Sequence, residues 1–417
     1  VEQLNQASDV YYNGKGELMT DYEWDAKFDQ LKKLEEETGE VLPDSPTNKV
    51  SEDTIVGKKE EHEFAALSLA KTKLVSDLVK WAEDRPIWIS WKLDGLTLVV
   101  TYDNGKLSKI VTRGNGHIGT NITHLASAIS GIPKTIKEKG HLVIRGEAVI
   151  SYADFEQFII ESEGDYANPR NLASGSLSLK DAEEVKQRHI QWIPFTLVYT
   201  EQEINSWGER MQMLQDLGFK PVERTRIEHP DEESIQAEIN RFTQKVTDKT
   251  NPYPVDGLVI CYDDTAYAAT GSVTGHHATR AGYAFKWQDE HADTELDHIE
   301  WSCAANTITP VAVFKPVELE GTTVQRASLC NVSECERLGI GGKGSKLQVI
   351  KANKIIPKVI NVTEPMGIFE IPTECPVCHA EATVKESESG TKTLHCSNPH
   401  CAAKQIKKFA RFVSKEG

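Results

Sequence analysis

In the first 40 residues, apolar side chains recur among charged ones with the period of a helix. Aromatic and leucine side chains recur there at helix-like intervals, which is typical of an amphipathic helix. These side chains are Tyr11, Tyr12, Leu18, Tyr22, Trp24, Phe28, Leu31 and Leu34. A proline-punctuated stretch at residues 42–47 then indicates a linker. The pattern predicts a small helical module over residues 1–48.

Beyond the linker, the hydrophobic pattern changes to short strands separated by turns. Ile87–Trp91, Thr97–Tyr102 and Leu142–Ile150 are rich in β-branched and aromatic residues. We therefore expect a mixed α/β domain over residues 65–290. Over residues 293–370 the strands shorten and crowd around a group of glycines, which predicts a small β-barrel.

Four of the eight cysteines gather near the end of the chain with the spacing of metal ligands. C-x2-C, a gap of 17 residues and C-x4-C describe the set Cys375, Cys378, Cys396 and Cys401. Two such knuckles deliver four thiolates to a tetrahedral Zn²⁺ ion, so we predict a structural zinc ribbon over residues 371–403. Two disulfides are the alternative. The scattered cysteines are Cys261, Cys303, Cys330 and Cys335, and they resemble the buried thiols of a reducing compartment.

Length and charge refine this picture. A chain of 417 residues exceeds one hydrophobic core, so two to four domains are expected. The net charge of −16 argues against nucleic acid, but the charge is segregated: residues 1–64 hold 7 Lys/Arg against 17 Asp/Glu, and residues 340–417 hold 12 against 7. Residues 404–417 begin a basic amphipathic helix. With no membrane-length apolar run and no secretory signal, we expect a cytoplasmic protein.

Four short motifs carry candidate chemistry. Trp91-Lys92-Leu93-Asp94-Gly95 places a lysine two residues before an aspartate, between two strand-like runs. This motif alone is weak, because surface strand lysines are common. The other three are Ile144-Arg145-Gly146-Glu147, Pro254-Val255-Asp256-Gly257-Leu258-Val259-Ile260 and Tyr283-Ala284-Phe285-Lys286-Trp287. In this order, the four resemble the nucleotidyltransferase motifs of polynucleotide ligases and mRNA capping enzymes.

Further motifs narrow the resemblance to bacterial NAD-dependent DNA ligases and extend it over the whole chain. They include Leu67-Ser68-Leu69, Thr112–Gly116, Ala167–Asn171, Gly175–Leu177, Thr309–Ala312, Gly321–Val324 and Ile356-Pro357. The resemblance implies a multidomain α+β protein. Its parts would be a helical module that binds nicotinamide mononucleotide (NMN), a nucleotidyltransferase (ATP-grasp-like ligase) α/β domain, an OB-fold β-barrel and a four-cysteine zinc ribbon.

The resemblance also implies a role for each motif residue. Lys92 would attack the α-phosphorus of NAD, although a free lysine has a pKa of about 10.4 and is mostly protonated at neutral pH. Lys286 would repel the proton from Lys92 and neutralise phosphate charge. Glu147 and Asp256 would order the ribose and Mg²⁺ or Mn²⁺. Asp94 would position the nucleotide and the nick.

Further contacts to NAD are implied in the helical module and around the nucleotide. The implied cofactor-binding set is Tyr11, Tyr12, Asp21, Trp24, Asp25, Leu67, Ser68, Leu69, Lys92, Arg113, Glu147, Arg170 and Lys286. The expected partner is nicked double-stranded DNA, because an OB barrel beside a basic ribbon suits a DNA backbone. We expect a monomer.

Several positions depart from the family pattern. Basic residues are expected where Cys261, Ser178 and Asp248 stand, with Lys249 a candidate substitute for the last, and a glutamate is expected at Ser90. These departures leave open a catalytically weakened or inactive protein that binds nicks or nucleotides. A capping enzyme or RNA ligase would share the lysine motif without the helical module.

The family pattern also extends beyond the end of this chain. Relatives continue past residues 412–414 into helix-hairpin-helix elements and often a BRCT domain. We expect a truncated chain, with a naturally short ligase or a separate C-terminal subunit as the alternatives.

Overall fold

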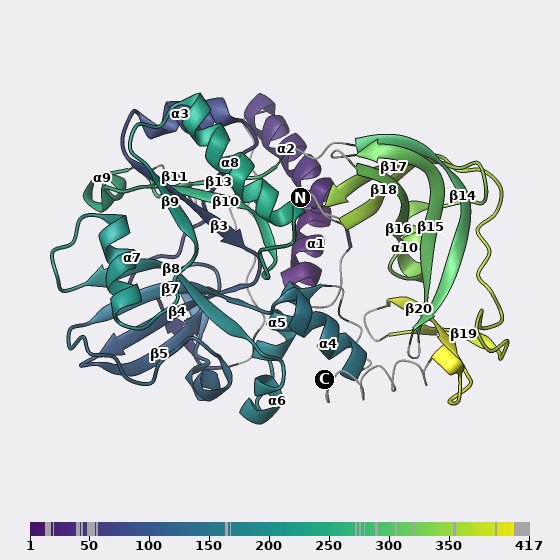
Figure 1. Cartoon of the computed structure of the whole chain (residues 1–417), viewed down its shortest axis with the longest axis horizontal. Coiled ribbons are helices and arrows are strands. Elements are labelled where there is room, and N and C mark those ends of the chain that lie inside the picture. The colour runs from purple at the N-terminus through teal and green to yellow at the C-terminus, as the bar shows by residue number, and fades with distance from the viewer. Residues whose placement is uncertain are drawn as a thin grey trace. The chain divides into compact units, whose positions relative to one another are not determined.

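The chain forms two compact units, which Figure 1 colours along the sequence. One unit comprises Val1–Met19, Trp24–Phe155 and Asn168–Trp287, and the other comprises Thr20–Glu23, Glu156–Ala167 and Gln288–Gly417. The computed structural model describes residues 1–12, 18–19, 21–38, 42, 45–47, 55, 57–162, 166, 168–271, 273–274, 277–278, 280–287, 291–304, 307–319, 322–352, 356–387 and 390–403. Within these ranges, no helix combines the length and the apolar character that crossing a bilayer requires.

Two helices occupy the stretch whose periodicity predicted helices. They are α1 (Glu2–Tyr12) and α2 (Asp21–Thr38). The Trp24 indole N–H donates to the Ser8 hydroxyl at 3.0 Å, and its ring stacks on Phe28 with centroids 4.8 Å apart. Trp24 thus anchors α2 against α1.

A five-stranded sheet forms the centre of the first unit. Its strands, in spatial order, are β2 (Ala70–Thr72), β13 (Tyr283–Phe285), β10 (Val255–Tyr262), β3 (Ile87–Leu93) and β9 (Arg224–Ile227). Only the pair β2 and β13 is parallel. The strand before the lysine motif is longer than predicted, because pairing with β10 continues through Lys92 and Leu93. Lys92 therefore lies in a strand and not in the turn after it.

A second, four-stranded sheet lies beyond the turn that follows Lys92. Its order is β5 (Lys106–Thr112), β4 (Leu96–Asp103), β7 (Leu142–Val149) and β8 (Gln191–Thr200). The turn passes so close to β7 that a Cβ atom at Gly95 would lie 2.1 Å from the Ala148 carbonyl oxygen. Glycine is required there, and the close approach brings the lysine motif next to β7. Two small pairs are β1 (Lys59–Glu61) with β6 (Ile118–Thr120) and β11 (Val273–Thr274) with β12 (His277–Ala278).

Helices cover the two sheets of this unit. They are α3 (Val75–Ala82), the 3-10 helix η1 (Thr123–Ala128), α5 (Pro169–Leu177), α6 (Ala182–Lys186), α7 (Trp207–Asp216), α8 (Glu232–Thr247) and α9 (Thr265–Ala269). Helix α4 (Tyr152–Ser162) is divided between the two units. Helix α8 begins with a capping box between Asp231 and Ser234. It packs against α3 (Figure 1), and Phe242 of α8 meets Trp91 of β3 edge to face at 4.6 Å.

The second unit contains the predicted β-barrel. Its strands are β14 (His291–Ala304), β15 (Thr307–Leu319), β16 (Thr322–Ser328), β17 (Lys346–Ala352) and β18 (Ile356–Glu364), with α10 (Val332–Leu338) after β16. The pairing order β14, β17, β18, β16 and β15 returns to β14, which closes the barrel. Leu296, Phe314, Leu347 and Val349 belong to its buried core.

A hairpin follows the barrel and carries the clustered cysteines. It consists of β19 (Ala382–Glu386) and β20 (Lys392–Cys396), and β20 also pairs with β15. The cysteines share a small core with Ile308 and Val332 of the barrel region. The hairpin is therefore continuous with the barrel.

Candidate functional site

Lys92 and Asp256 form the centre of the candidate site. The Nζ atom of Lys92 lies 2.7 Å from both carboxylate oxygens of Asp256. Asp256 lies at a register shift in β10, between Val255, which pairs with Leu93, and Gly257, which pairs with Lys92. A Cβ atom at Gly257 would lie 2.2 Å from the Phe285 carbonyl oxygen, so glycine allows β13 to approach. This approach brings the chain that carries Lys286 close to Asp256.

Three positive charges act on the Asp256 carboxylate. Its burial opposes ionisation, but the charges of Lys92, Lys286 and Arg170 hold its pKa below the usual value. The backbone of Lys286 is fixed by an N–H bond of 2.9 Å to the Thr72 carbonyl. The Lys92 ammonium thus donates to both oxygens of Asp256 and compensates the charge of this buried carboxylate. The sequence did not predict this ion pair.

Asp94 and Arg170 form a second ion pair beside the first. The Arg170 guanidinium donates to Asp94 at 2.6 Å. Arg170 stands in the first turn of α5, where the Asn168 side chain caps the helix by accepting the Asn171 N–H at 2.8 Å. The Asp94 N–H donates to the Pro254 carbonyl at 2.9 Å, which ties the lysine motif to the strand of Asp256.

Glu147 of β7 completes the acidic part of the site. It is buried, and it accepts the Gly95 N–H at 3.2 Å and the Thr97 hydroxyl at 2.8 Å. Burial raises its pKa to about 7, although Arg170, Thr97 and Lys92 oppose the shift. Four motifs far apart in the sequence are thus brought together, and their carboxylates and cations act on one another.

Two arginines hold the segment that contains Leu67, Ser68 and Leu69. Arg113 donates to the Ala66 carbonyl at 3.0 Å and to the Ser68 hydroxyl at 2.8 Å. Arg145 donates to the carbonyls of Phe64 and Ala65 at 3.1 and 2.8 Å. The sequence nominated Arg113 but not Arg145, although Arg145 stands in a quoted motif. Both arginines position the backbone before β2.

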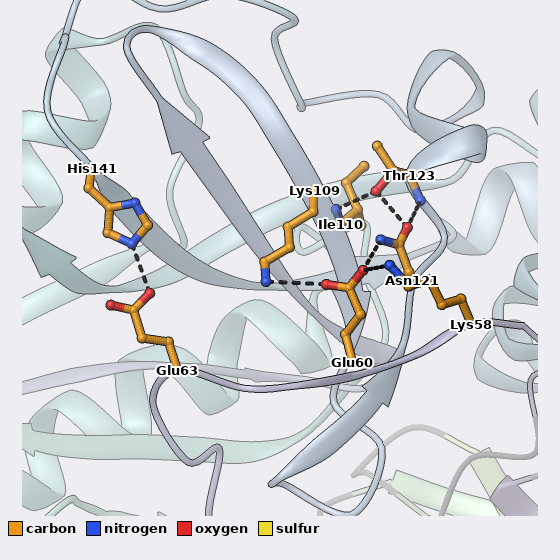
Figure 2. A network of polar contacts seen from close by, with 8 residues as sticks. All are labelled: Lys58, Glu60, Glu63, Lys109, Ile110, Asn121, Thr123 and His141. Carbon is orange, nitrogen blue, oxygen red and sulfur yellow. Dashed lines mark hydrogen bonds and ion pairs between the residues drawn. The ribbon is translucent and has the colours of Figure 1, made fainter.

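Figure 2 shows how the start of this segment is attached to the four-stranded sheet. Glu60 accepts from Lys109 at 3.2 Å and from the Asn121 amide at 2.7 Å. His141 contacts Glu63 at 2.8 Å through Nε2 and Asp103 at 2.6 Å through Nδ1. Asp103 above all, and then Glu63, raise the pKa of His141. The segment before β2 is therefore held at several points between Glu60 and Ser68.

The described part of the helical module places one of its five nominated side chains. Trp24 packs on Phe28, and the Nζ atom of Lys71 lies 5.3 Å from its ring centroid. The other four nominated side chains lie outside the described residues, although their backbones belong to α1 and α2. They are Tyr11, Tyr12, Asp21 and Asp25.

The positions that depart from the family pattern have structural roles of their own. Ser90 is buried in β3. Ser178 and Asp248 end α5 and α8 as their C-caps. Cys261 lies in β10, and burial raises the pKa of its thiol, so it is uncharged at neutral pH. None of these four side chains supplies positive charge.

The clustered cysteines have the geometry of a metal site. The Sγ atoms of Cys375, Cys378, Cys396 and Cys401 all lie within 4.8 Å of one another. Two sulfur pairs are 3.9 and 3.5 Å apart, whereas a disulfide bond is about 2.05 Å long. Burial opposes ionisation of Cys375, but backbone N–H groups, with those of Cys378 and Val377 foremost, lower its pKa to about 6. These separations exclude a disulfide bond between Cys375 and Cys401 and between Cys378 and Cys396.

Three family models match consecutive parts of the chain. Residues 58–290, more than half of it, match the NAD-dependent DNA ligase adenylation domain. The chain belongs to the NAD-dependent DNA ligase family. Residues 293–366 match the OB-fold domain of NAD-dependent DNA ligases, and residues 1–51 match the DNA ligase-like N-terminal NAD⁺-binding domain. The closed barrel described above is therefore the OB fold of an NAD-dependent DNA ligase.

Curated relatives support the same family. The chain is 43% identical over 422 residues to a DNA ligase of Lachnoclostridium phytofermentans. It is 41% identical over 423 residues to a DNA ligase of Ruminiclostridium cellulolyticum. Each alignment covers 100% of this chain and 63% of the relative. The resemblance to NAD-dependent DNA ligases is thus confirmed, and the chain spans less than two thirds of the length of these relatives.

Proposed function

We propose that this chain performs the chemistry of an NAD-dependent DNA ligase on nicked duplex DNA. Lys92 attacks the α-phosphorus of NAD, NMN leaves, and lysyl-AMP forms. The AMP then passes to the 5′-phosphate of a nick, and the 3′-hydroxyl attacks that phosphate and releases AMP. The observation that carries this proposal is the position of Lys92 among Asp256, Lys286 and Glu147.

The first step requires Lys92 to become a free amine. The Lys92 ammonium donates to Asp256, so a proton must leave its nitrogen and the freed electron pair must face the phosphorus before attack. Lys286 already acts electrostatically on Asp256 and can take over that carboxylate. Arg170 can then turn from Asp94 toward a phosphate, since guanidinium groups bind phosphate as well as carboxylate. Both exchanges keep the charges of the site paired.

The carboxylates of Asp256 and Glu147 also fit a divalent cation. Hard carboxylate oxygens suit Mg²⁺ or Mn²⁺, and burial without a full counter-charge raises the pKa of Glu147. A bound cation would neutralise charge on the phosphates of NAD. Asp256 and Glu147 would hold it, and Thr97 and the Gly95 N–H would orient Glu147.

The cysteine cluster fits a structural zinc ion. Four sulfur ligands at about 2.3 Å from Zn²⁺ would be about 3.8 Å apart in a tetrahedron, close to the separations of 3.9 and 3.5 Å in the cluster. With four thiolates the coordination is complete, so the ion would stabilise the hairpin and not take part in catalysis. Residues 404–417, which carry Lys404, Lys407, Lys408 and Arg411, lie outside the described residues.

A second candidate function is non-catalytic binding of nicks or nucleotides. It is favoured by Cys261, Ser178 and Asp248, which stand where the family pattern has basic residues. Each lost charge-assisted contact to phosphate would remove about 1.5 to 3 kcal/mol. The intact Lys92, Asp256 and Lys286 favour the enzyme.

Intact-mass measurement distinguishes the two functions. After incubation with NAD and Mg²⁺, the protein should gain the mass of one AMP, and ATP should give no gain. Lys92→Ala should abolish the adduct. No gain with NAD, a gain with ATP alone, or an adduct that survives Lys92→Ala would refute the proposal.

A further inference from the structure

Strand pairing places one further lysine on the face of the sheet that carries Lys92. Lys71 of β2 pairs with Ala284 of β13, and Ala284 pairs with Val259 of β10. Val259 in turn pairs with Ser90 of β3, two residues before Lys92. Directly paired residues project from the same face of a sheet, as do residues two apart in one strand. Lys71 and Lys92 therefore share one face.

Most residues near Lys71 are buried on both faces of the sheet, and Ala284 and Ser90 are the buried residues on its own face. The adjacent residue of each strand belongs to the other face of the sheet and is buried: Thr72, Phe285, Leu258 and Trp91. These four residues are also in register with one another. Lys71, by contrast, is exposed. An exposed lysine on the reactive face can meet a ligand that reaches Lys92.

Lys71 lies near Trp24, an aromatic residue of the segment that matches the NAD⁺-binding domain. The Lys71 Nζ atom lies 5.3 Å from the centroid of the Trp24 ring, within the range of a cation–π interaction. Trp24 is itself held in place, because its ring stacks on Phe28. Lys71 thus lies on the face of the sheet that carries Lys92, and it also contacts the domain that matches NAD⁺ binding.

The same face has lost a positive charge elsewhere. Cys261 stands two residues after Val259, on the same face of β10, at the position where a lysine was expected. Its uncharged thiol cannot stabilise a phosphate. Only β13 separates the strand of Cys261 from the strand of Lys71.

We propose that Lys71 binds the phosphate of the NMN half of NAD and supplies positive charge that Cys261 does not. When Lys92 attacks the α-phosphorus, the bond from that phosphorus to the bridging oxygen breaks. The electron pair and the negative charge go to NMN, and the Lys71 ammonium stabilises this leaving phosphate. This inference rests on the proposed function, because it assumes that NAD adenylates Lys92.

The reverse reaction tests the contact directly. Lysyl-AMP plus NMN should regenerate NAD, and the NMN concentration for half-maximal rate reports on NMN binding. Lys71→Met removes the charge and keeps most of the length, so this concentration should rise about tenfold or more. Lys71→Arg keeps the charge and should stay within about threefold of the parent. Lys106→Met, at an exposed lysine of β5, is the matched control and should have no effect.

Two further measurements test whether a weaker use of NMN by Lys71→Met results from a lost contact to NMN or from general damage to the site. Once adenylated, Lys71→Met should transfer AMP to nicked DNA as fast as the parent, because NMN has already left. Adding Cys261→Lys to Lys71→Met should recover part of the lost NMN affinity. If the double variant unfolds at the same temperature as Lys71→Met but binds NMN no better, Lys71 does not supply the charge that is missing at Cys261.

The outcomes also distinguish this inference from the proposed function. If the parent is adenylated but Lys71→Met has the same NMN dependence, the contact does not exist and the proposed function stands. Equal loss of NMN use and AMP transfer in Lys71→Met would also overturn the contact. If the parent is not adenylated by NAD, the proposed function itself fails.

Discussion

The Nζ atom of Lys92 lies 2.7 Å from each carboxylate oxygen of Asp256. This pair joins Lys92 to the strand of another motif 164 residues away in the sequence. The Lys92 ammonium compensates the charge of a buried anion and lowers the pKa of Asp256. A change at either residue should therefore affect the other.

Replacing Asp256 by asparagine should harm both folding and chemistry. The substitution leaves Lys92, Lys286 and Arg170 without their shared anion, and breaking a buried pair typically costs about 3 to 5 kcal/mol. Adenylation by NAD should fall by about a hundredfold or more. Thermal unfolding and intact mass would measure the two effects, with Asp216→Asn on the surface of α7 as the control. Normal adenylation of Asp256→Asn would remove Asp256 from the mechanism.

Glu147 should make stability depend on pH near neutrality. Its pKa rises from 4.5 to about 7 on folding, so between these values the folded chain keeps a proton that the unfolded chain has lost. The contribution of Glu147 to stability is therefore present below pH 4.5 and decreases as pH rises to about 7. The full decrease is about 3 kcal/mol. Glu147→Gln should remove this dependence and also reduce adenylation.

Unfolding measured at pH 5 and pH 8 tests this expectation. The parent should lose more stability than Glu147→Gln over that interval, whereas Glu201→Gln, at an exposed position, should follow the parent. Parallel pH profiles for the parent and Glu147→Gln would show that the carboxylate is not buried in solution.

Loss of one cysteine ligand should unfold the hairpin and disturb the barrel beside it. Cys396→Ser should lose zinc, because structural zinc supplies most of the folding free energy of such a small element. Ile308 and Val332 share the core of the cysteines, so the unfolding should extend to that end of the barrel. Binding of nicked DNA should weaken with a shallower salt dependence, while adenylation of Lys92 stays near normal.

Cys303→Ser is the matched control for that variant. Cys303 packs against the cluster without belonging to its four ligands, so the variant should retain one zinc ion per chain. Metal analysis and DNA titration at two salt concentrations would compare them. A parent protein without zinc, or unchanged DNA binding in Cys396→Ser, would contradict the zinc ribbon.

Removing residues 1–40 should separate the use of NAD from the later steps. The deletion takes away the helices that match the NAD⁺-binding domain, including Trp24, and leaves the two sheets around Lys92. Reaction with NAD should be abolished, while sealing of a nick that already carries AMP should persist. Gel assays with the two substrates would measure this difference, and equal loss of both activities would contradict it.

The sequence was sufficient to recognise the motifs but not to predict the ion pairs between them. Lys92, Glu147, Asp256 and Lys286 could be nominated because their motifs, in this order along the chain, resemble those of polynucleotide ligases. The ion pairs of Lys92 with Asp256 and of Arg170 with Asp94 could not, because they depend on strand order and on a register shift in β10. The sequence predicts a strand that ends at Trp91, whereas β3 continues to Leu93. The last two residues pair with β10, more than 160 residues away in the sequence, so the local pattern does not reveal them.

The hydrophobic pattern also did not predict the shortest strands. β1 and β2 have three residues each, too few for an alternating pattern, and they depend on partners at residues 118–120 and 283–285. The role of Arg145 could not be predicted for a different reason: it donates to backbone carbonyls, which every residue has, so no partner residue type marks the contact in the sequence. The barrel itself was predicted, but its strands do not shorten as expected, because β14 and β15 are longer than the strands of the two preceding sheets.

The pairing of β2 with β13 also constrains how the protein is made. One strand of the five-stranded sheet is complete by residue 72, but its parallel partner is not synthesised until residues 283–285. During translation the early strand must remain without that partner while more than 200 further residues are added. Non-local pairing of this kind folds slowly and leaves a strand edge open to other chains. The adenylation domain therefore reaches its native sheet only near the end of its own synthesis, and until then it is the part of the nascent chain most in need of protection from aggregation.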